Sequence, residues 1–406
     1  MTGYFFPEKA ASIYLEENRF EAFGGAGFHT VVHTPVPCRG ITEAERGQYK
    51  KKRRELMYAG TLEVHRFPMY AEGKNPLLRA LRYSLCWMIQ LWKGLRTEDV
   101  DCIYLASTPP IQGMLGAFLK KFKKGPFVYY NLQDILPDSL VGTGLARKGG
   151  LLWKIGRRIE DFTYRHADRI IVISEDFKKN IMEKGVPEEK IEVVYNWVDQ
   201  NAVVDVPRSE NKLIAKYGLD PEKFYIEYSG NIGLTQNMDL LLDVMKDLRT
   251  THPGIGLILI GDGAYRKNVE EYVRREGLDN VTMLPFQDYA DISHVFSLGD
   301  VGLVISKPEV GANSVPSKTW SIMSASRPVL ASFDENELKD ILTGNECGLF
   351  TAAGDREAFR NAVITLYEHP ELCRKYGANG RRFIMENLTK EIGTRKYVDV
   401  IKSVAG

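Results

Sequence analysis

Along the first half of the chain, short continuous apolar runs alternate with longer amphipathic stretches. The apolar runs at 101–106, 127–131 and 169–174 are typical of buried strands, and amphipathic stretches at 112–121 and 151–166 separate them as helices. Strands separated by helices of this length need crossover connections, which produce a parallel sheet covered by helices on both faces. The first half is therefore predicted to be a doubly wound α/β domain. Its other predicted elements are strands at 30–36, 63–69 and 191–195 and helices at 16–27 and 75–95.

The second half repeats this pattern after a polar stretch at 199–212, which has no periodicity and is predicted to be a linker. The predicted strands lie at 225–229, 256–260, 281–284, 301–305 and 329–331, and the predicted helices at 239–250, 264–276, 291–298, 356–368 and 370–388. The sequence thus predicts two Rossmann-like domains, 1–200 and 212–388, that face each other across a ligand-binding cleft. A last helix within 389–406 is predicted to return to the first domain.

Composition and charge refine this picture. A hydrophobic content of 44% with 26% charged residues is that of a soluble globular protein. The net charge of +1 conceals an asymmetry, because residues 1–170 hold 26 Lys and Arg against 17 Asp and Glu. Such an excess indicates an anionic partner for the first half, either nucleic acid or an anionic membrane surface.

The five cysteines are scattered without metal-ligand spacing, so we expect a reducing, cytoplasmic compartment and no metal site. The chain contains no apolar run of membrane-spanning length, and its start has no signal-peptide pattern. The first residues, 4–8, have the pattern of the end of a strand and its exit loop. The first strand is therefore predicted to be truncated.

The most informative local chemistry lies at 315–323, where a loop is predicted to enter a helix. Pro316 suits the start of a helix, and Trp320 and Met323 supply an apolar side. The first turn of a helix directs backbone N–H groups and the positive end of the helix dipole toward an anion. Lys318 has the wrong charge for this end of a helix, so it is either a solvated surface lysine or a ligand of that anion.

Two glycine-containing loops follow predicted strands of the same domain. Gly230 and Gly233 follow one strand, and Gly261 and Asp262 follow the next. Glycine at a strand exit lets the backbone approach a ligand closely, although each loop by itself is ordinary turn chemistry. Together with Lys318 and a helix N-terminus, these loops predict a site for a nucleotide diphosphate.

A series of short motifs occurs in order along the chain. They are Tyr-Phe-Phe-Pro-Glu at 4–8, Ser-Glu-Asp-Phe-Lys at 174–178, Val-Tyr-Asn-Trp-Val-Asp at 194–199, Tyr-Ser-Gly-Asn-Ile-Gly-Leu-Thr-Gln at 228–236, Ile-Gly-Asp-Gly at 260–263, Leu-Pro-Phe-Gln at 284–287, Val-Pro-Ser-Lys at 315–318 and Arg-Pro-Val-Leu-Ala at 327–331. In this order they resemble the family 4 retaining glycosyltransferases of GT-B fold. The runs at 107–113 and 133–140 look like the branch that builds bacterial O-antigen, capsule or exopolysaccharide units, including aminodeoxyhexose transferases.

The resemblance implies metal-independent transfer of a hexosyl or N-acetylaminohexosyl group, with retained configuration and no cofactor. The donor, expected to be a UDP-sugar, would bind the second domain, and a polyprenyl-diphosphate-linked saccharide acceptor the first. Lys318 and the backbone of 230–233 are expected to stabilise the leaving diphosphate. The departing phosphate would itself help to deprotonate the acceptor, so no separate nucleophile is needed.

Around this motif the sequence departs from many relatives. Asn313 and Ser321 are neutral where those relatives carry glutamates on the donor sugar and on the ribose. Asn313 is expected to hydrogen-bond the donor sugar, and Ser317 and Ser321 to lie at the nucleotide. Glu309 either replaces the first glutamate or belongs to a solvated loop.

Further departures concern the diphosphate and the first domain. Asn231 and Gln236 occupy positions where the family has arginine and lysine, which places more of the electrostatic demand on Lys318. Gln133 aligns with a histidine common in the first domain and is expected to touch the donor sugar. Asp134 is expected either to contact a sugar or to cap the following turn.

Basic and apolar residues interleave in several stretches of the first half. These stretches are Lys50-Lys51-Lys52-Arg53-Arg54, 74–93, 120–124 and 153–158. Basic amphipathic helices with tryptophan suit an anionic membrane surface, where a lipid-linked acceptor would lie. The alternative is that the apolar residues are core and the charges only solvated. Nucleic acid is disfavoured because no recognition motif is present, so the protein is expected to be peripheral at the inner face of the cell membrane.

Two other interpretations stay open. A catalytically silent GT-B subunit of a polysaccharide assembly is compatible with the missing glutamates. A sugar-nucleotide 2-epimerase would need a carboxylate and histidine set near the anomeric centre that the sequence does not show. A hydride-transfer enzyme is disfavoured because no Gly-x-Gly-x-x-Gly opens either domain.

Overall fold

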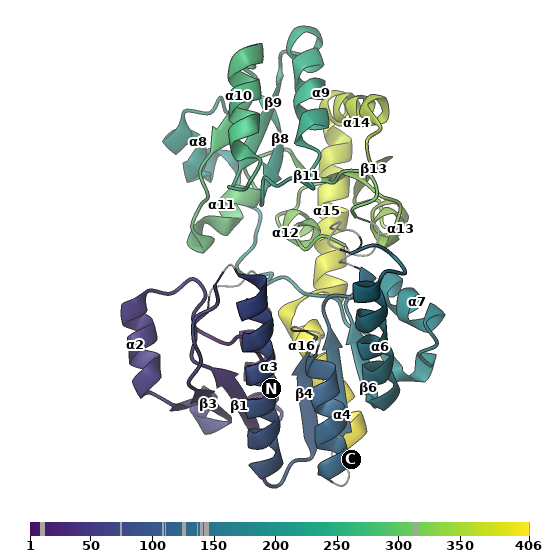
Figure 1. Ribbon diagram of the computed structural model, residues 1–406. Helices are drawn as coiled ribbons and strands as arrows, with labels where there is room; N and C mark the ends of the chain where they lie inside the picture. Colours follow the sequence, from purple (N-terminus) through teal and green to yellow (C-terminus); the bar gives the residue numbers. More distant parts are fainter. Residues whose placement is uncertain are drawn as a thin grey trace. The chain divides into compact units, whose positions relative to one another are not determined.

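The computed structural model of the chain contains two compact units (Figure 1). The first comprises Met1–Tyr195 with Glu391–Gly406, and the second Asn196–Lys390. The structure describes residues 1–8, 13–73, 75–107, 109, 111–123, 127–135, 137–138, 141, 146–311 and 315–405. In this part of the chain no helix is long and apolar enough to cross a membrane.

The first unit holds two sheets rather than the single parallel sheet expected from the sequence. Four parallel strands are ordered β4 (Cys102–Ala106), β5 (Phe127–Leu132), β6 (Arg169–Val172) and β7 (Ile191–Val193). The other sheet has the order β1 (Thr30–Pro35), β3 (Leu62–Phe67) and β2 (Arg54–Met57), and β2 is antiparallel.

The first residues of the chain lie between these two sheets. The Thr2 N–H donates to the carbonyl oxygen of His33 on β1 at 3.3 Å, and the Met1 amine to that of Tyr104 on β4 at 3.4 Å. The next residues, Tyr4–Glu8, therefore leave at the carboxyl ends of the neighbouring parallel strands, which is where ligands of such sheets bind.

Local sequence signals explain where the helices of the first unit begin. The helices are α1 (Ile13–Gly25), α2 (Glu43–Lys51), α3 (Pro76–Arg96), α4 (Gln112–Phe122), α6 (Leu151–His166), α7 (Glu175–Glu183) and α16 (Lys390–Ala405). The Asn75 side chain accepts from the N–H groups of Leu77 and Leu78 and so caps α3, which has proline at its first position. Thr42 and Glu45 form a capping box at α2.

A cluster of Arg19, Tyr104 and Tyr397 holds α16 on the first unit. The Arg19 guanidinium of α1 lies over the rings of Tyr104 and Tyr397, at 5.3 and 5.0 Å from their centroids. Because Tyr397 is 1% exposed, α16 is part of the core of this unit.

The second unit is one parallel sheet of six strands. Their order is β10 (Val281–Leu284), β9 (Ile255–Ile260), β8 (Phe224–Ser229), β11 (Val301–Ile305), β12 (Val329–Phe333) and β13 (Gly348–Ala352). From β8 the chain builds outward on one side and from β11 on the other. The topological switch point therefore lies between β8 and β11.

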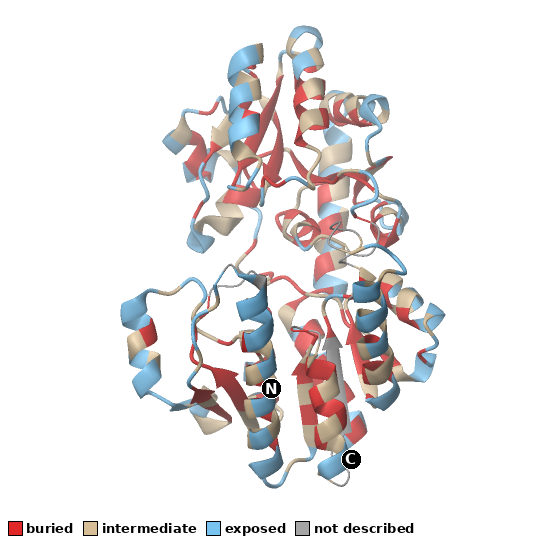
Figure 2. Ribbon diagram, in the orientation of Figure 1, coloured by how far each residue is buried: buried red, intermediate tan, exposed pale blue. Residues whose placement is uncertain are grey.

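Amphipathic helices cover this sheet with their apolar sides and bury most of it (Figure 2). The helices are α8 (Lys212–Tyr217), α9 (Met238–Thr251), α10 (Arg266–Glu276), α11 (Ile292–Phe296), α12 (Lys318–Ser324), α13 (Glu337–Gly344), α14 (Arg356–Glu368) and α15 (Pro370–Asn387). Strand β9, next to the edge strand β10, is buried at each of its positions, as expected for a strand covered on both faces.

The polar stretch predicted as a linker packs against the second unit instead. The N–H groups of Val204 and Val206 donate to the hydroxyl oxygens of Ser293 and Ser297, each at 3.0 Å. Lack of periodicity at 199–212 predicts a linker, and in the structure the backbone of this stretch is hydrogen-bonded to side chains of α11 and of the residue after it.

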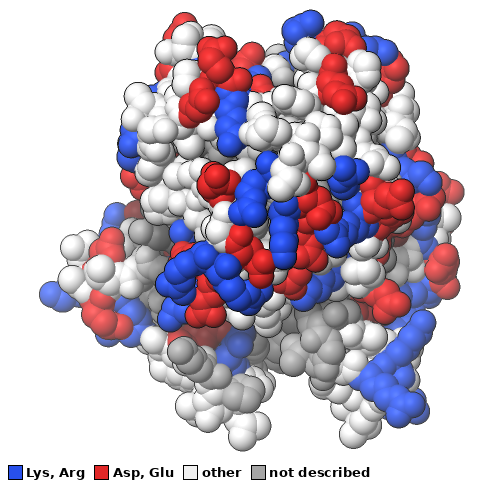
Figure 3. Space-filling model, turned by 90° about the horizontal axis from the view of Figure 1, so that it is seen from above, with Lys and Arg blue, Asp and Glu red and all other residues white. Residues whose placement is uncertain are grey.

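Charged side chains of both signs are interspersed on the face of the molecule drawn in Figure 3. Charged side chains of the second unit form ion pairs, for example Arg356 with Asp247 and Lys246 with Glu276, each at 2.6 Å.

Candidate active site

The carboxyl ends of β8 and β11 form the candidate site of the second unit. The loop that begins at Gly230 follows β8, and the chain after β11 leads to α12, which begins at Lys318. These strands are neighbours and the chain leaves them toward opposite sides, which is the topological position at which open α/β sheets bind ligands.

The glycines of these loops allow close packing of the backbone, in addition to any approach of a ligand. Gly230, Gly261 and Gly263 have φ values of +143°, +136° and +159°, which suit glycine alone. A Cβ atom on Gly261 would lie 2.0 Å from the Gly230 carbonyl oxygen. The Gly230 N–H donates to the Ile260 carbonyl oxygen at 2.9 Å, so this amide is not free for a diphosphate as the sequence had suggested.

Side chains of the same loops also close turns. The Gly233 N–H donates to Oε1 of Gln236 at 3.1 Å, and the Gly263 N–H donates to Oδ1 of Asp262 at 2.8 Å. The backbone carbonyl oxygen of Asn231 accepts from the Tyr228 hydroxyl at 2.7 Å. Gln236 and Asp262, both predicted ligands, thus shape the loops around the switch point.

Lys318 lies at the centre of this site. Its Nζ is 3.6 Å from the centroid of the Tyr228 ring and 2.8 Å from the position that a Cβ atom on Gly230 would occupy. Burial lowers the pKa of Lys318 to about 7, and the nearby charge of Glu227 partly offsets this effect. The side chain is therefore a cation placed against a π face and a glycine loop, where an anion would restore its full charge.

Glu227 on β8 is a site residue that the sequence did not reveal. It is 1% exposed, and among the described residues its Oε1 has no hydrogen-bond partner. Burial raises its pKa to about 7, while the Ser229 hydroxyl and the Lys318 charge lower it in part. A glutamate inside the apolar strand Phe224–Ser229 was the available signal.

Helix α12 differs from the anion-binding helix that the sequence predicted. It has only seven residues, and its exposed N-cap residue, Ser317, makes no side-chain capping bond. The N–H groups of Thr319 and Trp320 donate to the carbonyl oxygens of Pro316 and Ser317, at 2.9 and 3.1 Å. Because these amides are engaged in the tight turn, the positive charge of the site comes from Lys318 more than from the helix end.

The remaining predicted residues of this unit have different environments. Ser321 is half-buried on α12, one turn after Ser317. Glu309 is exposed with a φ of +68°, and its N–H donates to Oδ1 of Asp334 at 3.0 Å, so it belongs to a loop at the end of β11. Asn313 lies outside the described residues.

Gln133 and Asp134 belong to the first unit. The Gln133 N–H donates to the Ser107 hydroxyl at 3.0 Å, which ties the exit of β5 to the exit of β4. Both residues therefore sit at the carboxyl edge of the four-stranded sheet, where the sequence placed them.

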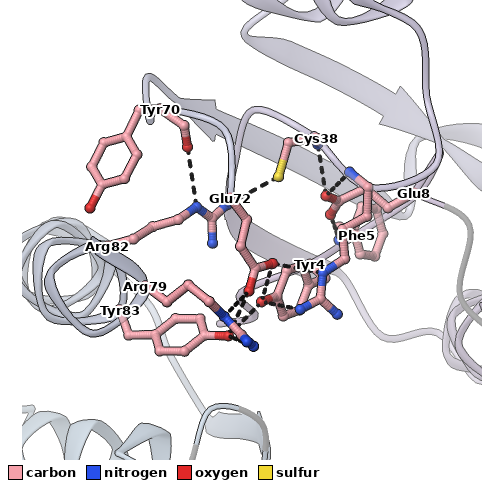
Figure 4. A network of polar contacts seen from close by, with 10 residues as sticks. Tyr4, Phe5, Glu8, Cys38, Tyr70, Glu72, Arg79, Arg82 and Tyr83 are labelled. Atoms are coloured by element: carbon pink, nitrogen blue, oxygen red, sulfur yellow. Dashed lines mark hydrogen bonds and ion pairs between the residues drawn. The ribbon is translucent and has the colours of Figure 1, made fainter. Parts of the chain in front are cut away.

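A polar network occupies the carboxyl edge of the other sheet of this unit (Figure 4). The Glu72 carboxylate accepts from Arg39 Nε at 2.7 Å, Arg79 Nε at 2.8 Å and the hydroxyls of Tyr4 and Tyr83 at 2.9 and 3.0 Å. Burial alone would raise the pKa of Glu72, but hydrogen bonds from Arg39 and Tyr4 hold it at about 2. Glu72 is therefore ionised, and it fixes two guanidinium groups at this edge.

The buried Glu8 fixes the backbone segments that carry Tyr4 and Arg39 of this network. Glu8 is 3% exposed, and its carboxylate accepts from the N–H groups of Phe5, Cys38 and Arg39 at 2.8 to 3.0 Å. It thereby joins the segment after the N-terminal residues to the segment after β1. The sequence suggested that Glu8 lies at a strand end but not this structural role.

A cavity of about 500 Å³ lies elsewhere in the first unit, beside α6, α7 and the segment that leads into β7. It is lined by Arg157, Asp161, Tyr164, Arg165, Lys184, Gly185, Val186, Pro187 and Lys190. These residues precede β6 and β7 or end the adjoining helices, so the cavity is at the amino edge of the sheet. Ligands of doubly wound sheets bind at the opposite edge. Among the described residues, no cluster of three or more metal-ligating side chains occurs.

Comparison with solved structures defines the class of protein. The chain is similar to HepE of Anabaena, determined in complex with UDP, with a TM-score of 0.73 and 16% identity over 99% of this chain and 100% of that one. The shared fold is GT-B, with two Rossmann-like domains.

Family models then identify the chain within this class. A glycosyl transferase 4-like domain matches residues 19–197, and a glycosyl transferases group 1 domain matches residues 209–383. The chain therefore belongs to the family 4 glycosyltransferases of GT-B fold. Among its relatives are a probable glycosyltransferase of Pseudomonas aeruginosa, WbjE, and a putative colanic acid biosynthesis glycosyl transferase of Escherichia coli, WcaI. They are 24% and 26% identical to it, over 84% of each chain.

Proposed function

We propose that this glycosyltransferase moves a sugar, with retention of configuration, from a UDP-sugar to a lipid-linked saccharide in the synthesis of a bacterial surface polysaccharide. The observation that carries the proposal is Lys318, a cation set at the switch point of the second unit. The names of the relatives support the pathway, since one is assigned to colanic acid. The nucleotide follows from HepE, which binds UDP on the same fold.

The leaving diphosphate would receive its charge stabilisation from Lys318. With a pKa of about 7, this side chain is only partly protonated near neutral pH, and a bound diphosphate would raise its pKa again. A preorganised cation in a closed site contributes roughly 3 kcal/mol or more to the stability of such a transition state. The site therefore needs no metal ion in this proposal.

The neutral side chains at Asn313 and Ser321 limit the roles that remain for protein groups. Neither can act as a base, so the departing phosphate oxygen is the proposed acceptor of the proton from the attacking hydroxyl. The bond from the anomeric carbon to the diphosphate breaks on the face where the new glycosidic bond forms. The configuration is then retained without a covalent intermediate.

The acceptor is proposed to meet the first unit at the carboxyl edge of its sheets. There Arg39 and Arg79, about half of each side chain exposed, are held in place by Glu72. Fixed guanidinium groups suit the phosphate groups of a polyprenyl-diphosphate carrier. An acceptor of this kind would place the enzyme at the inner face of an anionic membrane, in agreement with the basic excess of residues 1–170.

The test is transfer of a labelled sugar to a lipid-linked acceptor after a thermal-shift comparison of UDP, GDP and dTDP. We expect UDP alone to raise the melting temperature and its sugar to appear on the lipid. Stabilisation by UDP without any transfer would overturn the catalytic proposal in favour of a silent subunit. Interconversion of the free sugar nucleotide would instead indicate an epimerase.

A further inference from the structure

Helix α3 of the first unit presents a continuous apolar stripe to solvent. Its members are Leu77, Leu78, Leu81, Met88, Trp92 and Leu95, whose side chains are between 41% and 79% exposed. Large apolar side chains are exposed singly on most proteins, but a row of them along a whole helix usually marks an interaction surface.

Helical geometry places this stripe on one side of α3. At about 100° per residue the six side chains fall within an arc of about 100°. The buried residues Arg82, Cys86 and Gln90 lie on the opposite side and attach the helix to the unit. A helix of 21 residues is about 30 Å long, so the stripe extends over about that length.

The charges carried by α3 itself have one sign, whereas Glu98, Asp99 and Asp101 follow its C-terminal end. Neither α3 nor the adjoining α4 contains an aspartate or glutamate. Lys93, Arg96 and Lys121 flank the stripe, and the Arg96 guanidinium lies 4.0 Å from the centroid of the Trp92 ring. Arg79 is held by Glu72, so the flanking charge comes mainly from the C-terminal half of the helix.

The neighbouring helices extend this surface. Helices α3, α4 and α6 pack in that order. The outer sides of α3 and α6 are exposed, whereas α4 is exposed only at Lys121 and Phe122 near its end (Figure 2). Leu151, Leu152 and Ile155 in the first turns of α6 are 78%, 54% and 46% exposed, and Lys154 lies among them. On α4, Phe122 is 59% exposed.

We propose that the α3 stripe, with the start of α6, enters the headgroup region of an anionic bilayer and seats the first unit on it. This inference rests on the lipid-linked acceptor of the proposed function and names the surface that reaches the lipid. The positive charge of α3 favours a lipid bilayer over a second copy of the chain as the partner of this surface. A symmetric contact through α3 would bring its cations against one another, whereas an anionic bilayer neutralises them.

The test is partitioning onto vesicles with roughly one third phosphatidylglycerol in phosphatidylcholine. The variant carries Leu81→Ser, Met88→Ser and Trp92→Ser, and the control is Met385→Ser, a similarly exposed methionine on α15 of the second unit. We expect the triple variant to bind these vesicles at least tenfold more weakly, because the apolar area that enters the lipid is lost, and the control to bind unchanged. Equal binding of triple variant and control would overturn the proposal.

A second measurement identifies what covers the stripe. Brominated acyl chains should quench the tryptophan fluorescence of the wild-type protein, and Trp92→Phe should remove most of the quenching. Absence of quenching, or a concentration-dependent dimer that the triple variant abolishes, would contradict insertion into lipid. Thermal stabilisation by UDP should persist in the triple variant, so failure of the membrane proposal is distinguishable from failure of the proposed function.

Discussion

Replacement of Glu227 by glutamine should make the protein more stable at high pH and leave it nearly unchanged at low pH. Burial raises the pKa of Glu227 from 4.5 to about 7. Between these values the folded protein keeps a proton that the unfolded chain has released. The free energy of unfolding of the wild type therefore falls as the pH rises through this window, and above pH 7 the loss is complete.

The size of the effect follows from the same two values. A difference between 4.5 and about 7 corresponds to about 3 kcal/mol for the ionisation of a carboxyl group that is 1% exposed. Glutamine has the same shape and no charge at any pH. The free energy of unfolding of Glu227→Gln should therefore exceed that of the wild type by up to about 3 kcal/mol more at about pH 8 than at about pH 4.

Urea unfolding of both proteins at these two pH values measures this gain. Lys318→Met provides a comparison of opposite sign, because the pKa of Lys318 is lowered from 10.5 to about 7. The substitution Lys318→Met should stabilise the protein fully below pH 7, and this stabilisation should fade as the pH rises toward 10.5. If Glu227→Gln changes the free energy of unfolding equally at both pH values, or lowers it only at high pH, the claim that the folded protein holds Glu227 in its protonated form is refuted.

Three further changes test the site, the network and the basic stretch. Gly230→Ala should destabilise the protein by about 1–3 kcal/mol in urea unfolding and weaken UDP binding, because the backbone there has a positive φ and the new Cβ would meet Lys318. Glu72→Gln should cost about 2 kcal/mol of stability near neutral pH, with the difference vanishing as acid titration passes a pKa of about 2; a constant difference would contradict the network. Reversal of charge at the exposed residues Lys51 and Arg53 should reduce sedimentation with anionic vesicles, and unaltered sedimentation would remove this stretch from the membrane surface.

Periodicity predicted the regular elements of the fold well. Helix α6, at 151–166, and strand β11, at 301–305, have the bounds expected from the sequence, since each is a clear amphipathic or continuous apolar segment. Strand β2 was missed because Arg54–Met57 follows a run of basic residues and lacks an apolar pattern. It forms as an antiparallel edge strand that pairs with β3, the next strand along the chain.

The candidate site was predictable to a smaller extent. Lys318 stood out because its charge does not suit the start of a helix. Glu227 did not, since its effect depends on burial and on a lysine 91 positions later in the chain. The bonding of the Gly230 amide to Ile260 could not be foreseen either, because it depends on the approach of two loops that only the folded sheet brings together.

The central claim is that Lys318 holds the diphosphate of the donor, and UDP affinity measured by titration calorimetry tests it most directly. Lys318→Met should weaken UDP binding at least a hundredfold, in line with the loss of a preorganised cation worth roughly 3 kcal/mol, while its circular dichroism stays that of the wild type. Lys375→Met, which removes a lysine that pairs with Glu346 on the surface of the same unit, should bind UDP as the wild type does. Equal affinity of Lys318→Met and wild type would contradict the assignment of the site.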